Sequence, residues 1–456
     1  MKAVSYLLLL PLAMIVLFTQ CEKDEPEPEP QPKHEITDVN FLNALIERGV
    51  DTNGDSIISS VEAAAVTYLN IYECDISDVS GIEKFVNLET LYCSNNQLTS
   101  LDISRSLDLK CLDCSNNKLT SLDVSKCTTL SDLYCEYNQL STLDVSNNVT
   151  LDRLNCSANK LTTLDVSHNI ALTSLSFHNN QISTIDLSNN TALTGLYCIN
   201  NQLTTLNIST NKAIERLEVW NNHITSLNVS NSTSLIYLHC SDNQLADLDV
   251  SNNTALEFLR CENNQIAILD VTYNNALDFL DCSDNQLTIL DVSNSIALTG
   301  MRCNNNQLTK LDVSNNTALR SLGCSDNQIT SLDVSNNTAL RSLDCENNQL
   351  ATLDVSNQPD LHELYCGSNQ ITSLDLSNQP DLHILSCGGN QLTSLDISNN
   401  SNLGLGVGYW ISCFLEIGDM PSLEEVCVWW IPFPYPGFLL CADDSPNVYF
   451  TTNCSE

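Results

Sequence analysis

The sequence predicts a repeat solenoid: a β-dominated stack of short coils with a small α-helical N-terminal cap and an irregular C-terminal cap. A block of 21 residues begins at Leu88 and recurs without insertion fifteen times, the last copy starting at Leu382. Each copy places apolar residues at matching offsets, so each unit forms one coil that buries its apolar face only against its neighbours. Segments without the repeat flank the array, and we expect these to be caps.

Each unit divides into two half-turns of 10 and 11 residues. Leu91 and Cys93 in the first half are answered by Leu101 and Ile103 in the second, with period-2 spacing in both. Such spacing is typical of short strands, and half-turns of this length leave no room for a helix. We therefore expect short strands on opposite sides of each coil and almost no helix in the solenoid, residues 69–402.

The repeat resembles the bacterial leucine-rich repeat. Leu88, Leu91, Cys93, Asn96 and Leu98 fill its L-x-x-L-x-L-x-x-N-x-L pattern, with cysteine where leucine is usual. The resemblance implies a leucine-rich-repeat stack over about two thirds of the chain. The unit directly before it resembles the internalin-type repeat and joins the N-terminal cap to the stack.

Residues 1–20 are predicted to be a secretory signal. Lys2 precedes an apolar run over 7–18, which is too short to span a bilayer because spanning takes about 20 apolar residues. Cys21 follows at once, and the arrangement resembles a bacterial lipoprotein signal, which implies that this cysteine is lipidated. A plain cleaved signal is the alternative, because residues 18–20 depart from those usual before that cysteine.

Residues 21–33 form a predicted acidic tether in which Pro and Glu alternate over 25–30. Such a stretch buries no apolar area and stays extended and solvated. An acidic run directly after a lipidated cysteine resembles the surface-export signal of some Gram-negative lipoproteins, which implies an outer-membrane lipoprotein exposed at the cell surface. A periplasmic or secreted protein behind a mere spacer is the alternative.

The chain contains 18 basic and 56 acidic residues, a formal net charge of −38. This field repels nucleic acid and anionic membranes, and the sequence lacks the basic footprint that either partner requires. We therefore expect no nucleic-acid partner, and membrane contact only through the lipid anchor. The chain is expected to be a monomer.

Residues 34–68, the predicted helical cap, contain a candidate calcium loop. Its oxygen donors fall at the ligand positions of an EF-hand pattern: Asp51, Asn53, Asp55, Ile57 through its carbonyl, Ser59 and Glu62. The segment resembles EF-hand and dockerin-type loops, which implies a structural calcium ion, although Ser56 stands where glycine is usual. A simple turn before a helix is the alternative. We expect Asp38 to cap a first helix and a second helix to run over 62–66.

Three positions of the repeat are interpreted as structural. Cysteine fills the sixth place in thirteen of fifteen units, but Phe177 and Val219 fill it in the other two, so the place is apolar and interior rather than metal-binding. Asparagine fills the ninth place throughout and is expected to bond the backbone of its own and the adjacent coil. Aspartate at the fifteenth place is expected to cap turns, with a cation-binding edge as the alternative.

Residues 403–456 form the predicted C-terminal cap, which has four cysteines outside the repeat pattern. In an exported segment we expect these to form two disulfides, with three pairings open. The cysteines are Cys413, Cys427, Cys441 and Cys454.

The third, fifth and seventh places of each unit are expected to point outward from one continuous sheet face. Aromatic residues and arginines gather there in units six to eleven, while the rest of the face is mostly small or acidic. This composition is typical of a binding hot spot; packing of aromatics across strands is the alternative. The candidate partner-binding residues are Tyr197, Arg216, Trp220, Tyr237, His239, Phe258, Arg260, Phe279 and Arg302.

The sequence contains no phosphate loop, nucleophile elbow or clustered metal ligands that would support an enzyme. We therefore predict a non-catalytic binding or adhesion module at the cell surface, which recognises a protein or glycan through the outward face. A structural envelope spacer without a ligand is one alternative. A hydrolase with its site in the C-terminal segment is the other.

Overall fold

The computed structural model describes residues 36–405, 413–434 and 437–454. The predicted signal, Cys21 and the tether lie outside the described residues. The described part has two α-helices, α1 (Val39–Glu47) and α2 (Ser60–Ala64), and one 3-10 helix, η1 (Ile82–Lys84). None of the helices within these ranges has the length and apolarity required to cross a bilayer.

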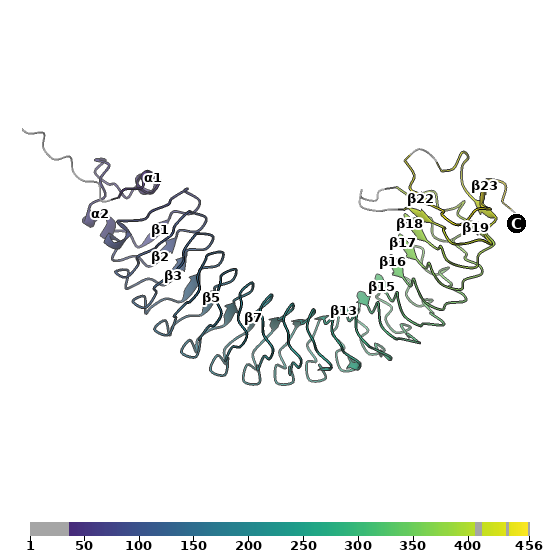
Figure 1. The fold of residues 1–456 in the computed structure, drawn as a ribbon, viewed down its shortest axis with the longest axis horizontal. Coiled ribbons are helices and arrows are strands. Elements are labelled where there is room, and N and C mark those ends of the chain that lie inside the picture. Colours follow the sequence, from purple (N-terminus) through teal and green to yellow (C-terminus); the bar gives the residue numbers. More distant parts are fainter. Residues whose placement is uncertain (1–35, 406–412, 435–436, 455–456) are drawn as a thin grey trace, which may run out of the picture. The chain divides into compact units, whose positions relative to one another are not determined.

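An 18-stranded parallel sheet runs through the coils of the described residues. Each strand pairs in register with its equivalent in the next coil, so that Leu91 lies opposite Leu112, and Leu112 opposite Leu133. The strands lie side by side along one side of the stacked coils (Figure 1). In spatial order they are β1 (Tyr68–Asn70), β2 (Thr90–Tyr92), β3 (Cys111–Asp113), β4 (Asp132–Tyr134), β5 (Arg153–Asn155), β6 (Ser174–Ser176), β7 (Gly195–Tyr197), β8 (Arg216–Glu218), β9 (Tyr237–His239), β11 (Phe258–Arg260), β13 (Phe279–Asp281), β14 (Gly300–Arg302), β15 (Ser321–Gly323), β16 (Ser342–Asp344), β17 (Glu363–Tyr365), β18 (Ile384–Ser386), β20 (Leu415–Glu416) and β22 (Leu440–Cys441).

Strands on the opposite side of the coils are rarer than the sequence predicted. In the described residues β10 (Leu248–Asp249) pairs with β12 (Leu269–Asp270), and β19 (Ser394–Asp396), β21 (Glu425–Cys427) and β23 (Tyr449–Thr451) form a sheet at the C-terminal end. The predicted fold class and the near absence of helix from the solenoid are confirmed. The expectation that each coil has a strand in its second half is wrong.

The aspartate at the fifteenth place forms the same local bond in coils with and without a strand at this place. The backbone N–H of Ser125 donates to Asp123 Oδ1 at 2.9 Å, and the same bond recurs in other coils, for example from Ser146 to Asp144. Such a bond closes a local turn. Asp249 of β10 and Asp270 of β12 accept it too, so it is compatible with pairing to the next coil. The predicted role of this aspartate in capping turns is confirmed.

The cysteine column is interior, as predicted. Cys240 and Cys261 are 0% exposed, and so are Phe177 and Val219 at the same place in other coils. Burial raises the pKa of the Cys240 thiol, which keeps it protonated and unreactive. The column therefore functions as part of the hydrophobic core.

Asparagine at the ninth place joins each coil to the one before it. In a representative coil, Asn159 Oδ1 accepts a hydrogen bond from the Leu140 N–H at 2.9 Å. Its Nδ2 donates to the carbonyls of Cys135 at 3.0 Å and Cys156 at 3.1 Å. One buried amide thus satisfies backbone groups in two coils, which confirms the predicted role.

A second row of buried amides, not predicted from the sequence, lies at the nineteenth place. Asn148 is 0% exposed, and its Nδ2 donates to the carbonyls of Val124 at 3.0 Å and Cys127 at 2.8 Å. Gln358 takes the same role later in the stack, donating to the Val334 carbonyl. The recurrence of asparagine at this place is the signal in the sequence that marks the row.

The N-terminal cap closes the first coil with two short helices. Asp38 Oδ1 accepts hydrogen bonds from the N–H groups of Asn40 and Phe41, so it caps α1 as predicted. Helix α2 begins at Ser60, two residues before the predicted start, because Ser59 and Glu62 form a capping box.

We predict that Asn159→Ala lowers the free energy of unfolding by about 1–3 kcal/mol, the cost of leaving the buried Leu140 N–H without a partner. The carbonyls of Cys135 and Cys156 keep the hydrogen bonds from Asn138 and Asn180. Urea denaturation followed by circular dichroism measures the change. Asn189→Ala is the control, since its amide makes an exposed hydrogen bond to the Ser167 carbonyl, and it should cost less than about 1 kcal/mol. Equal effects of the two substitutions would contradict this role for the ninth place.

Candidate functional site

The outward face of the sheet is built from alternate residues of each strand. In β2 the central Leu91 is buried, whereas Thr90 and Tyr92 on either side are partly exposed, and most strands of the sheet repeat this pattern. The prediction that the third and fifth places face outward is therefore confirmed for most coils.

The seventh place is more buried than predicted. Ser157 is 0% exposed, and its hydroxyl lies 2.8 Å from the hydroxyl of Ser176, a fifth-place residue of the next coil. Ser94 bonds Asp113 in the same way. For these serines the predicted outward orientation is wrong, because a fifth-place side chain of the following coil covers them.

Three aromatic rings form a continuous stack, which we call the ring ladder: Tyr237, Phe258 and Phe279. They occupy matching positions on β9, β11 and β13. The ring centroids of Tyr237 and Phe258 are 4.4 Å apart with planes 4° from parallel, and those of Phe258 and Phe279 are 4.9 Å apart at 15°. Since the faces cover one another along the stack, the ladder presents mainly ring edges outward.

Each end of the ring ladder is also covered. The guanidinium carbon of Arg216 lies 3.8 Å from the Tyr237 ring centroid, a cation–π contact. At the other end Phe279 lies against Gly300, where a Cβ would come within 2.9 Å of the ring. Glycine at this place therefore lets the Phe279 ring settle against the neighbouring strand.

A second stack lies beside the first. Trp220 and His239 have ring centroids 5.4 Å apart and planes 22° from parallel. Burial, together with the nearby positive charge of Arg260, lowers the pKa of His239, so this imidazole is neutral at neutral pH.

The arginines of the patch each have an acidic neighbour. Arg216 lies 2.7 Å from Glu218, and Arg302 lies 3.9 Å from Asp281. Arg260 forms an ion pair with Glu262 on its own coil. These pairs hold the guanidinium groups in place on the sheet face.

Tyr197 is set apart from the rest of the predicted patch. Its ring leans over Gly195 of its own strand, where a Cβ would lie 3.1 Å from the tyrosine Cε2. The structure therefore brings eight of the nine predicted residues into two stacks and their flanking ion pairs, and it places Tyr197 at the edge of a neighbouring hollow.

In the candidate calcium loop, Glu62 binds across the loop. Its Oε1 accepts hydrogen bonds from the N–H and hydroxyl of Thr52, both at 2.8 Å, and its Oε2 accepts from the N–H of Ser59 at 3.0 Å and its hydroxyl at 2.8 Å. The bonds from Ser59 and Thr52 lower the pKa of Glu62 from 4.5 to about 2. This network therefore stabilises the cap above about pH 4.5 and is lost as the pH falls toward 2.

Asp51 organises the other end of this loop. Its two carboxylate oxygens accept hydrogen bonds from Gly54 N–H at 2.8 Å and Ser56 N–H at 2.9 Å. Ser56 has a φ of 63°, the left-handed conformation that glycine usually supplies at this position of the pattern. Ser56 thus adopts the backbone conformation that glycine has at this position of the pattern.

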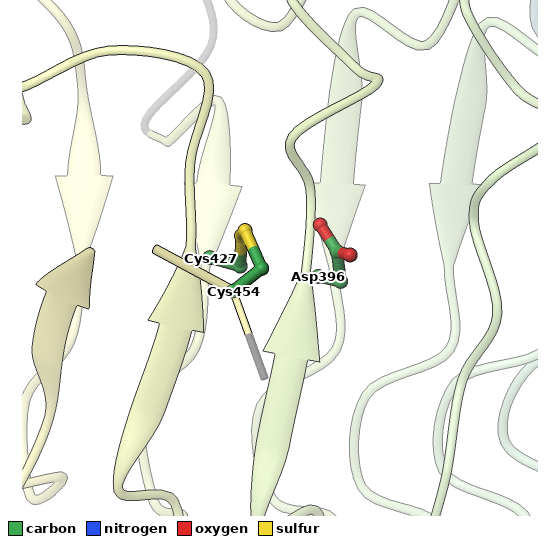
Figure 2. A group of neighbouring side chains, drawn as sticks. All are labelled: Asp396, Cys427 and Cys454. Atoms are coloured by element: carbon green, nitrogen blue, oxygen red, sulfur yellow. A yellow bond between two sulfur atoms is a disulfide. The ribbon is translucent and has the colours of Figure 1, made fainter. Parts of the chain in front are cut away.

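The described residues contain a close group of metal-ligating side chains outside the candidate calcium loop. In the described ranges, three Asp, Glu, His or Cys side chains bring ligand atoms within 4.8 Å of one another only at Asp396, Cys427 and Cys454. Figure 2 shows that the two sulfur atoms are bonded to each other beside the carboxylate of Asp396. Disulfide sulfurs are not thiolates, so this group is not a metal site while the bond is intact.

The structure selects one of the three cysteine pairings that the sequence left open. Cys413 is bonded to Cys441, and Cys427 to Cys454. Both bonds link neighbouring strands or turns of the C-terminal cap.

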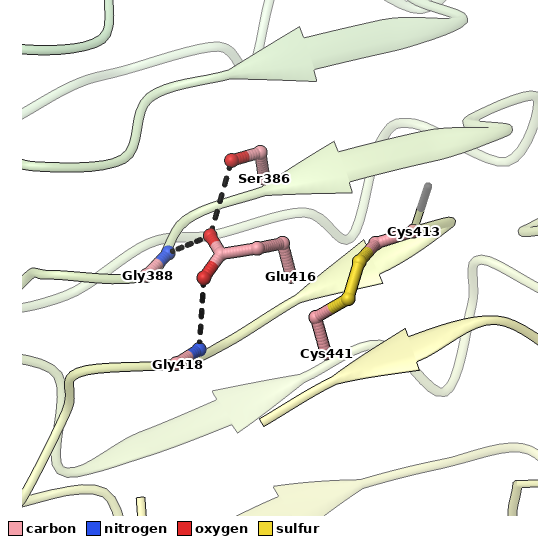
Figure 3. The surroundings of a disulfide bond; sticks show 6 residues. All are labelled: Ser386, Gly388, Cys413, Glu416, Gly418 and Cys441. Carbon is pink, nitrogen blue, oxygen red and sulfur yellow. Dashed lines mark hydrogen bonds between the residues drawn. A yellow bond between two sulfur atoms is a disulfide. The ribbon is translucent and has the colours of Figure 1, made fainter. Parts of the chain in front are cut away.

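Glu416 lies beside the first disulfide and joins the cap to the last repeat (Figure 3). Its carboxylate accepts hydrogen bonds from the N–H groups of Gly388 at 2.9 Å and Gly418 at 3.0 Å, and from the Ser386 hydroxyl at 3.1 Å. A Cβ at Gly388 would come within 2.2 Å of this carboxylate, so glycine makes room for it. These contacts assign Glu416 a structural role in the cap.

Comparisons with known proteins agree with this architecture. The family model for leucine-rich repeats in two copies matches residues 65–106 and 317–358. The functional domain of InlJ from Listeria monocytogenes, which includes a cysteine ladder, is 35% identical, with 81% of this chain and 77% of that chain covered and a TM-score of 0.68. The chain therefore belongs to the same family of leucine-rich-repeat proteins as InlJ.

Two further solved structures share the fold at lower identity. A leucine-rich-repeat protein from Leptospira interrogans is 24% identical, with 76% of this chain and 93% of that chain covered and a TM-score of 0.66. The Arabidopsis receptor kinase HAESA, in complex with the peptide hormone IDA and the co-receptor SERK1, is 20% identical, with 83% and 69% covered and a TM-score of 0.68. No curated protein matches the sequence.

Proposed function

We propose that this chain is a non-enzymatic binding module that holds a protein partner through the ring ladder and the side chains beside it on β8 to β13. The observation that carries this proposal is the row of half-buried aromatic rings, covered at one end by Arg216, on a face that is otherwise mostly small or acidic. Aromatic residues and arginines dominate binding energy at protein interfaces because they bury large areas with few rotatable bonds.

The geometry supports a pre-organised contact surface. Stacking restrains Tyr237, Phe258 and Phe279 before any partner arrives, so binding costs less side-chain entropy. The ion pair from Arg216 to Glu218 likewise holds its guanidinium in place. Because the ring faces are covered within the stack, the ladder suits the varied surface of a protein better than the flat face of a sugar ring.

The fold is compatible with such a role. HAESA, which shares the fold, is in complex with a peptide hormone and a co-receptor. For location, we propose that the chain is an outer-membrane lipoprotein exposed at the cell surface, attached through Cys21 and acting as a monomer. The support is the N-terminal sequence: an apolar run, this cysteine and an acidic tether.

We predict that the double substitution Phe258→Ser and Phe279→Ser weakens binding to a protein partner by tenfold or more, or about 1.4 kcal/mol. Serine occupies the same place at Ser321 and Ser342, so the coil accepts it. An array of extracellular proteins identifies the partner, and surface plasmon resonance measures the affinity. Tyr92→Ala removes an aromatic side chain from the same face outside the patch and should leave binding unchanged.

Two results would count against the proposal. If no protein on the array binds the wild-type chain, the envelope spacer becomes the better account, since the stacked rings also pack neighbouring coils together. If the double variant loses its cooperative thermal transition, the rings are primarily packing residues.

We also propose that the loop from Asp51 to Glu62 holds a structural calcium ion. Its donors are all oxygens, which is the ligand chemistry calcium takes, and they would be Asp51, Asn53, Asp55, the Ile57 carbonyl, Ser59 and Glu62. The carboxylates of Asp51, Asp55 and Glu62 do not all three lie within 4.8 Å of one another in the structure, and Glu62 uses both oxygens in hydrogen bonds. When bound, the ion would neutralise these carboxylates and stiffen the cap.

We predict that calcium at ten times its dissociation constant, which for extracellular sites is about 0.1–1 mM, stabilises the chain by about 1.4 kcal/mol. Thermal unfolding with calcium, with magnesium and with chelator measures this effect. Glu62→Gln should remove the response, while Glu47→Gln, a change at an exposed position on α1, should keep it. A calcium response that survives Glu62→Gln, or no response in the wild type, would refute the site.

A further inference from the structure

A hollow of about 430 Å³ opens on the outward face of the sheet, over β4 to β8 and next to the ring ladder. Its floor is made by small side chains, Ser174 and Ser176 of β6 and Asn155 of β5. Its volume falls within the range of about 300–1,000 Å³ that small-molecule sites usually occupy. The hollow is centred on β6, where both outward side chains, Ser174 and Ser176, are small, while larger side chains of the neighbouring strands surround it.

Larger side chains close the hollow along the stack. Tyr134 and Arg153 line it on β4 and β5, and Tyr197 and Glu218 line it on β7 and β8. Tyr197 reaches across its own strand because Gly195 has no Cβ to obstruct it. The hollow is therefore a bounded site between two phenol rings.

The full charges at its edges already have partners. Arg153 lies 3.4 Å from Asp132, and Arg216 lies 2.7 Å from Glu218. Burial lowers the pKa of His178, which also lines the hollow, so its ring is neutral at neutral pH. A ligand here meets no unpaired charge among the described lining residues, and this favours a neutral ligand.

The neutral polar groups, by contrast, retain hydrogen-bonding capacity. Ser176 Oγ lies 3.0 Å from His178 Nδ1 and 2.8 Å from Ser157 Oγ, which holds the imidazole in place. Asn155 accepts the Ser157 N–H through Oδ1. Within the described residues the Asn155 amide nitrogen, the Ser174 hydroxyl and the second imidazole nitrogen of His178 have no protein hydrogen-bond partner.

We propose that this hollow binds one neutral pyranose unit of a glycan. A pyranose has apolar C–H faces, which suit the rings of Tyr134 and Tyr197, and a rim of hydroxyls that both donate and accept hydrogen bonds. The amide of Asn155, the hydroxyl of Ser174 and the imidazole of His178 offer matching donors and acceptors. The site extends the proposed function, since it rests on the same outward face, but it uses coils that precede the ring ladder.

Saturation-transfer NMR on the full chain tests the proposal directly. The probes are the methyl glycosides of glucose, galactose, mannose and N-acetylglucosamine. We expect at least one of them to receive saturation from the protein and the others to compete according to their hydroxyl arrangement.

Two variants locate the binding. Ser174→Phe fills the hollow, and the coil accepts phenylalanine at this place because Phe258 occupies it in β11. Asn155→Asp keeps the acceptor for Ser157 but removes the amide donor, and Asp344 occupies the same place in β16. Each should reduce glycoside binding about fivefold or more. Ser321→Phe, the same change at the same place on β15, is the control and should keep full binding.

The outcomes separate this proposal from the protein-binding role. Glycoside binding that survives the Phe258→Ser and Phe279→Ser double substitution but not Ser174→Phe supports the hollow as a separate sugar site. No saturation of any glycoside, or binding unchanged in both hollow variants, overturns it. If Ser174→Phe impairs only protein binding, the hollow receives a side chain of the protein partner and the sugar proposal is wrong.

Discussion

The structure depends on the buried amide at the ninth place of each repeat. Asn117 Oδ1 accepts the Leu98 N–H of the preceding coil at 2.9 Å, while its Nδ2 donates to the carbonyls of Cys93 and Cys114. The amide satisfies backbone groups that lie inside a turn, where neither water nor a strand partner reaches them. Because the same bonds recur in coil after coil, they fix successive coils in one register. That register is what aligns equivalent side chains into straight columns.

The inward-facing columns of side chains form the core, and the outward-facing columns form the surface. Inward columns need only apolar side chains of suitable volume, which is why Cys240, Phe177 and Val219 serve equally at one place. Outward columns carry no such constraint and are free to differ from coil to coil. Differences between coils in these outward columns produce two surface features. Bulky rings at matching places form the ring ladder, and small residues at the same places form the hollow beside it. A surface of this kind acquires binding specificity without changing the fold.

The sequence was sufficient to predict what the period determines. The parallel stack, the buried Leu91 and Cys93, and the composition of the aromatic patch all follow from counting places within the repeat. Side-chain contacts between coils could not be predicted in this way. Ser157 is buried because Ser176 of the next coil lies over it, and the stacking of Phe279 depends on the absence of a side chain at Gly300. In the second half-turn the aspartate closes the same turn in coils with and without a strand, so the repeat pattern does not determine where those strands form.

Hydrogen exchange at the Leu140 N–H tests the central claim most directly, because this group lies outside any strand and has Asn159 Oδ1 as its hydrogen-bond partner. If the buried amides hold the coils in register, this N–H exchanges as slowly as the strand amides of β4 and β5, and Asn159→Ala accelerates it while leaving distant coils unchanged. Exchange at the rate of an exposed turn in the wild-type protein would show that the amide row does not hold the stack together.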